Sequence, residues 1–75
     1  MVFVYVKLLN EEAETPTKAH RSDAGYDLYA SENTVVVGRQ RTTIKTGVSF
    51  DMPEGLAGLI WPRSGLSVKK GIDVL

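Results

Sequence analysis

The chain has 75 residues, of which 43% are hydrophobic, with no cysteine and a single histidine, His20. This composition allows one small domain and excludes disulfides, thiolate metal sites and histidine-based zinc sites. Nine basic and nine acidic residues cancel, so no long-range field attracts nucleic acid or an anionic membrane. Any anion site must therefore be local, and any metal must be a hard cation held by oxygen, with Mg²⁺ the usual choice beside phosphates.

The N-terminal stretch MVFVYVKLLN lacks the basic start and the small-residue cleavage site of a signal peptide. It is also too short to span a bilayer, so we expect an intracellular protein, cytoplasmic or nuclear. Residues 2–9 are rich in Val, Phe and Tyr and are predicted to form a strand. Because this strand is apolar on both faces, it needs cover on both, from this chain or another.

The polar stretch 10–24 is predicted to be a loop. Pro16 would break a helix, and Thr15 before it is pushed toward extended geometry. A loop of this length in so small a domain tends to carry a function or to form an arm.

Short apolar runs follow at close spacing, separated by turn signals at Gly38, Gly47 and Pro53–Gly55. No stretch keeps a helical period, and this spacing predicts an all-β sandwich, barrel or jelly roll. The last run has no turn signal or polar tail after it, so we expect residues 1–75 to be one N-terminal portion of a larger domain. The predicted strands are residues 26–30, 34–37, 41–46, 48–52, 56–61 and 71–75.

Residues 61–67 read WPRSGLS. Pro62 ends the preceding strand, and Gly65 permits a tight turn and the close approach of a ligand. Arg63 offers a planar fork of donors suited to phosphate oxygens, Ser64 offers a hydroxyl, and the backbone amides that follow can form an anion-binding nest. Taken alone, the stretch is equally typical of a strand-ending turn with an exposed arginine.

A second stretch, SDAGYDLYA at residues 22–30, places the small residues Ala24 and Gly25 at a strand entrance. Such residues permit close packing or close approach of a ligand. Asp27 follows on the predicted strand, where acidic residues are disfavoured. It either faces solvent, which is the favoured interpretation of the residue alone, or holds a hydrated Mg²⁺ directly or through water.

Together, AGYDLYA and the later PRSGL resemble the first two conserved motifs of the trimeric dUTPase family, the dUTP nucleotidohydrolases. The similarity covers essentially the whole chain. It implies a distorted jelly roll or β-barrel, a homotrimer, and Mg²⁺-dependent hydrolysis of dUTP to dUMP and pyrophosphate. It also implies that Asp27 positions the Mg²⁺–triphosphate through water and that Arg63, Ser64 and Gly65 contact the phosphates. Gly65 favours the dUTPases over the related dCTP deaminases, which usually read Arg-Ser-Ser at this loop.

The resemblance stops before the family's third motif, which carries the uracil-binding hairpin, the water-activating aspartate and a tyrosine under the deoxyribose. That motif should begin directly after Leu75. Asp73 falls several residues before the catalytic aspartate and is interpreted as a strand residue. We therefore expect the chain to hold the phosphate and metal half of a site, with no catalytic residue of its own. Alone it should be inactive, and it should act as a homotrimer or with a complementary C-terminal segment.

Two other functions remain open: a non-catalytic dUTPase-like β module that binds nucleotide or a protein partner, and a small barrel that binds single-stranded nucleic acid. The barrel needs a basic groove with stacking aromatics, which zero net charge and few aromatic residues disfavour. Trp61 is interpreted as a core or interface residue rather than a base-stacking one. The basic residues interpreted as solvated, rather than as guides for a triphosphate, are Lys18, His20, Arg21, Lys69 and Lys70.

Overall fold

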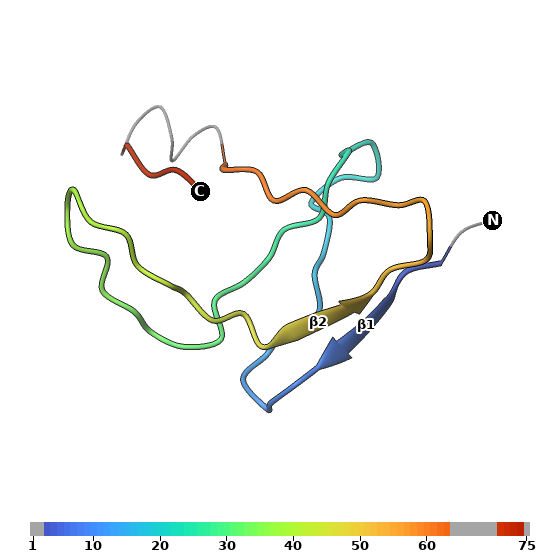
Figure 1. Cartoon of the computed structure of the whole chain (residues 1–75), viewed down its shortest axis with the longest axis horizontal. Helices are drawn as coiled ribbons and strands as arrows, with labels where there is room; N and C mark the ends of the chain where they lie inside the picture. The colour runs from blue at the N-terminus through green and yellow to red at the C-terminus, as the bar shows by residue number, and fades with distance from the viewer. Residues whose placement is uncertain (1–2, 64–70, 75) are drawn as a thin grey trace.

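β1 (Tyr5–Leu8) and β2 (Val48–Asp51) form an antiparallel pair, drawn as two arrows in Figure 1. The computed structural model describes residues 3–63 and 71–74, and this pair is the one sheet in those ranges. Aromatic and β-branched side chains suit the pleated geometry. The strands predicted at the N-terminus and after Gly47 are therefore confirmed, with narrower bounds.

The ladder ends at Leu8 opposite Val48, and the Leu9 amide continues it by donating to the Gly47 carbonyl at 2.8 Å. Gly47 has a φ of 67°, in the left-handed region that glycine adopts without penalty. A Cβ at this position would lie 2.8 Å from the Cβ of Ala13. Glycine is therefore required here, where the ladder meets the loop that follows β1.

The other predicted strands form no ladder in the ranges that the structure describes. One antiparallel bridge, between Thr17 and Asp27, is all that remains of pairing at the first of them. A strand needs a hydrogen-bonded neighbour along its length, and the described chain supplies none to these segments. The expectation of strands here is therefore wrong for the described chain. The segments are 26–30, 34–37, 41–46, 56–61 and the described part, 71–74, of the last one.

The stretch 10–24 is a loop, as predicted. A turn closes where the Asp23 amide donates to the His20 carbonyl at 3.0 Å. Pro16 is buried, and Ala13 is only 9% exposed. These are the most buried residues of the described chain, so the loop is anchored rather than a free arm.

Large apolar side chains are exposed over much of the described chain. Phe3 is 62% exposed, Tyr5 68% and Leu59 72%. β1 is thus apolar on both faces, and the described residues cover neither of them. The cover that the sequence analysis expects for this strand stays a prediction.

The return path of the chain after β2 positions the site. The Leu56 amide donates to the Pro53 carbonyl at 3.3 Å, which closes a turn. Residues 56–63 then run back past residues 23–29, as the orange and cyan-to-green traces show in Figure 1.

No helix occurs in the described part of the chain, so the predicted all-β class is confirmed. It follows that these residues include no helix of the length and apolar character needed to cross a membrane.

Candidate functional site

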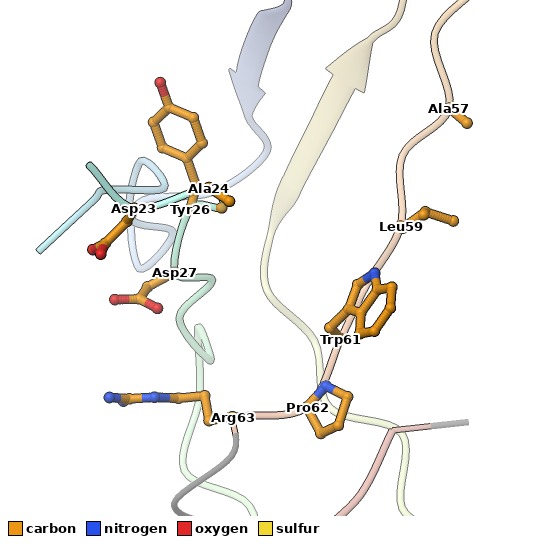
Figure 2. A pocket seen from close by; sticks show the side chains of 10 residues that line it. Asp23, Ala24, Tyr26, Asp27, Ala57, Leu59, Trp61, Pro62 and Arg63 are labelled. Carbon is orange, nitrogen blue, oxygen red and sulfur yellow. The ribbon is translucent and has the colours of Figure 1, made fainter. Parts of the chain in front are cut away.

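An open pocket of about 590 Å³ forms where the segment after β2 passes the loop-to-strand segment 23–27 (Figure 2). Ligand pockets typically enclose about 300–1,000 Å³. Residues 23–27 make the first wall, and Ala57, Leu59 and residues 61–63 make the second. Alternate residues of an extended segment share a face, which brings the odd-numbered residues of the second wall together. The pocket therefore joins AGYD of one predicted motif to WPR of the other.

Asp27 is half-buried on the first wall and is paired through both of its backbone polar groups. Its N–H donates to the Thr17 carbonyl at 2.7 Å, and the Thr17 N–H donates to the Asp27 carbonyl at 3.3 Å. Among the residues that the structure describes, no hydrogen bond or ion pair engages the Asp27 carboxylate. A held backbone with an uncommitted carboxylate suits a contact to a ligand or a metal.

Asp23 places a second carboxylate on the same wall, one that the sequence analysis did not single out. Its Oδ2 accepts a hydrogen bond from the His20 N–H at 2.9 Å. Such local bonds are typical of aspartate in turns, and the polar run around Asp23 was the available signal for it. The Asp23 carboxylate is therefore partly committed to holding the turn.

Arg63 comes from the second wall and is exposed. Figure 2 shows its guanidinium extending to the side of the pocket on which the carboxylates of Asp23 and Asp27 lie. The structure thus brings together Asp27 and Arg63, which the sequence analysis assigned to one site. The other two predicted residues, Ser64 and Gly65, lie outside the described residues.

Trp61 lines the pocket and is 73% exposed. A core position is therefore wrong for this residue in the described chain, and an interface position stays a prediction. Tyr26 and Leu59 also line the pocket, although the sequence analysis did not select them. Leu59 could have been found from its alternation with Trp61, because both belong to one face of an extended segment.

The donor set of the pocket fits a hard cation. The described ranges contain no group of three or more His, Cys, Asp or Glu side chains that could hold a metal ion by themselves. Mg²⁺ needs no such group, since it keeps several waters and binds one or two carboxylates plus substrate phosphates. Asp27, with Asp23 on the same wall, offers ligands of this kind. The pocket therefore fits Mg²⁺ shared with a phosphate, and not a closed structural metal site.

Asp73 is exposed and does not line the pocket. Its Oδ1 accepts a hydrogen bond from the Val74 N–H at 2.8 Å. This placement supports the interpretation of Asp73 as a residue without a catalytic role, which stays a prediction.

The basic residues of the first loop are exposed, in line with their interpretation as solvated. Lys18 has a further contact, because its Nζ lies 4.7 Å from the centroid of the Tyr26 ring. A lysine over an aromatic face is attracted by the ring quadrupole. Lys69 and Lys70 lie outside the described residues.

Comparison with known proteins extends this picture. The family model for dUTPase matches residues 11–75. The deoxyuridine 5'-triphosphate nucleotidohydrolase of Eremothecium gossypii is 51% identical over 68 residues, which cover 91% of this chain and 44% of that relative. The protein of the same name from Paramecium bursaria Chlorella virus 1 is 45% identical over 75 residues, covering 100% of this chain and 53% of the relative.

Solved structures agree with the family match. A mutant dUTPase from phage phi11 of S. aureus, described for the coordination of a structural Mg(II) ion, superposes with a TM-score of 0.84 at 41% identity. It is matched over 91% of this chain and 44% of its own. A mutant dUTPase of Staphylococcus bacteriophage 80alpha with dUpNHpp gives a TM-score of 0.84 at 40% identity, over 92% of this chain and 41% of its own. These likenesses confirm the predicted fold, a part of the dUTPase jelly roll.

The chain spans about half the length of the curated relatives it matches, from 44% of one to 53% of another. Within that span the family match includes both walls of the pocket, since residues 23–27 and 57–63 lie inside 11–75. The resemblance inferred from the two motifs is therefore confirmed, and the chain belongs to the dUTPase family.

Proposed function

We propose that residues 1–75 are the N-terminal portion of a dUTP diphosphatase, which hydrolyses dUTP to dUMP and pyrophosphate with Mg²⁺. The observation that carries the proposal is the pocket in which Asp27 and Arg63, from the two family motifs, stand on different walls. Membership of the dUTPase family supports this activity, as do the relatives named deoxyuridine 5'-triphosphate nucleotidohydrolase.

Arg63 is proposed to bind the triphosphate. Its guanidinium can donate two parallel hydrogen bonds to phosphate oxygens, and it stays charged at any working pH. The Ser64 hydroxyl and the backbone amides at Ser64 and Gly65 would add donors on the same loop. Donors fixed in advance around the phosphates stabilise the charge that develops as pyrophosphate leaves.

Asp27 is proposed to hold Mg²⁺ through water, with its backbone held against Thr17. When bound, the ion neutralises charge on the phosphate oxygens and orients them for displacement. The task of Asp27 itself is to present an ionised carboxylate at a constant place on the wall that faces Arg63.

The chain supplies no catalytic residue in this proposal. Hydrolysis needs a base that takes a proton from the attacking water while the bond to pyrophosphate breaks. Asp27 is assigned to the metal, and Asp23 accepts the His20 amide. We therefore expect the base and the uracil contacts to come from a complementary C-terminal segment, and the chain to be inactive alone.

A homotrimer or a complementary segment is the proposed partner. The exposed apolar side chains of β1 support this, because their burial would stabilise an assembly. We call the chain together with these partners the assembled protein. A substrate of free nucleotide with Mg²⁺ is consistent with an intracellular location, which is part of the proposal.

The test is pyrophosphate release by the assembled protein, with dUTP and dCTP offered separately in the presence of Mg²⁺. The proposal expects release from dUTP and little from dCTP. Binding of dUpNHpp without release from either nucleotide would instead assign the non-catalytic nucleotide-binding module.

A further inference from the structure

We propose that Thr17 is a positioning residue for Asp27, so that the loop 10–24 is part of the site and more than a connection. This inference rests on the proposed function, because the place of the Asp27 carboxylate matters only if the pocket takes a metal-bound phosphate. Neither of the two predicted motifs contains Thr17, which lies ten residues from Asp27 in sequence.

The first observation is the register of the bridge. Thr17 and Asp27 exchange both backbone hydrogen bonds, at 2.7 and 3.3 Å, which defines a hydrogen-bonded antiparallel pair. In such a pair the two side chains stand on the same face, with their Cβ atoms about 4.5–5.5 Å apart. Thr17 is therefore the cross-strand neighbour of Asp27, on the face that carries its carboxylate.

The second observation is a hydrogen bond between the Thr17 and Tyr29 hydroxyls. Tyr29 follows Asp27 by two residues, so in an extended segment it lies on the same face. The bond links Thr17 to the residue beyond Asp27, while the bridge links it to Asp27 itself. Asp27 is thus held at its own backbone and two residues later by one partner.

The opposite face has a contact of its own. The Lys18 Nζ lies 4.7 Å from the centroid of the Tyr26 ring. Figure 2 shows this ring directed away from the Asp27 carboxylate, as alternation along an extended segment requires. Residues 17 and 18 therefore hold the first wall of the pocket from both faces.

The loop can serve as a support because it is itself anchored. Pro16, directly before Thr17, is buried and has a fixed φ. Ala13 is buried as well, and it packs where Gly47 leads into β2. The bridge at Thr17 therefore refers the position of Asp27 to the ladder of the fold.

The variants that test this are Thr17→Val and Tyr29→Phe, which remove the two hydroxyls of one bond with little change in shape. Thr17→Ser keeps a hydroxyl and serves as the rescue variant. Thr43→Val is the matched control, because Thr43 is also exposed and does not line the pocket. All are made in the assembled protein, with unfolding measured first to set aside any variant that fails to fold.

Two readouts separate positioning from mere stability. One is the Mg²⁺ concentration for half-maximal dUTP turnover, together with kcat and KM. The other is hydrogen exchange at the Asp27 amide, which reports the bridge without any turnover. We expect Thr17→Val and Tyr29→Phe each to raise the Mg²⁺ requirement about three- to tenfold, the range that one net hydrogen bond allows. The double variant should lose no more than either single one, and Thr17→Ser should recover most of the loss.

Faster Asp27 exchange and a higher Mg²⁺ requirement in both single variants, with Thr43→Val unchanged, support the inference. Normal Mg²⁺ dependence in folded Thr17→Val and Tyr29→Phe overturns it, even if both variants are less stable. If the wild-type protein releases no pyrophosphate, the proposed function fails. The exchange readout then still decides whether the Thr17 hydroxyl holds Asp27, with unchanged exchange in both variants overturning that claim.

Discussion

The β1–β2 ladder and the walls of the pocket are held together in different ways. The ladder pairs residues 5–8 with residues 48–51 in one continuous register, through backbone bonds. The first wall has a single bridge, at Asp27, and the second wall has no ladder partner among the described residues. The chain therefore provides its own pairing at the ladder, whereas the site depends on a few separate contacts and on cover from elsewhere.

The largest effect should come from withholding that cover. The purified 75-residue chain should release pyrophosphate from dUTP far more slowly than the assembled protein. The missing general base alone accounts for about 10²–10⁴-fold. The measurement is pyrophosphate release with Mg²⁺ on both samples, at matched chain concentration. Robust turnover by the chain alone, abolished by Asp73→Asn, would contradict both this expectation and our interpretation of Asp73.

The ladder should be most sensitive at Gly47. Gly47→Ala forces a side chain into a positive φ, at a cost of about 1–2 kcal/mol. The new Cβ also overlaps Ala13, and such overpacking typically costs about 1–3 kcal/mol more. Equilibrium unfolding of the assembled protein measures the sum. Gly38→Ala is the control, because a Cβ there meets nothing within 4 Å. Equal stabilities of the two variants would show that the ladder does not close on Gly47.

Arg63→Ala should leave the ladder intact and weaken the pocket. Each charge-assisted hydrogen bond lost to a phosphate is worth about 1.5–3 kcal/mol, so the affinity for dUpNHpp should fall at least tenfold. Calorimetric titration measures this loss. Arg41→Ala is the matched control, since Arg41 is exposed and does not line the pocket. An equal loss in both variants would mean that only net charge matters.

The smallest effect should be that of the contact between Lys18 and Tyr26. Lys18→Met keeps most of the apolar stem and removes the charge, and exposed cation–π contacts are worth about 0.5–1 kcal/mol. In a Tyr26→Leu background the same substitution should cost nothing further. A double-mutant cycle by equilibrium unfolding gives the coupling free energy, and a value of zero would remove this contact from the account of the first wall.

The sequence was sufficient to predict the ladder and the pairing of the two motifs. Runs of aromatic and β-branched residues marked both strands, and the order of the two motifs brought Asp27 and Arg63 into one hypothesis before either was located. These predictions succeeded because the first depends on local composition and the second on a specific resemblance.

The same patterns could not predict where the other apolar segments find partners. Residues 26–30 and 56–61 have strand composition, but a ladder depends on a neighbour that composition does not specify. The role of Thr17 was also invisible, because the loop shows no alternation and its register against Asp27 is a long-range property. The exposed pocket position of Trp61 has the same explanation, since its environment is set by which segments meet there.

The central claim is that Asp27 and Arg63 do different tasks in one phosphate pocket. Calorimetric titration of the assembled protein with dUpNHpp, with and without Mg²⁺, tests it most directly, using wild type, Asp27→Asn and Arg63→Ala. We predict that Asp27→Asn loses most of the gain in affinity that Mg²⁺ gives and keeps its metal-free affinity, whereas Arg63→Ala is weaker under both conditions. Retention of the full Mg²⁺ gain in Asp27→Asn, or wild-type affinity in Arg63→Ala, would contradict the account.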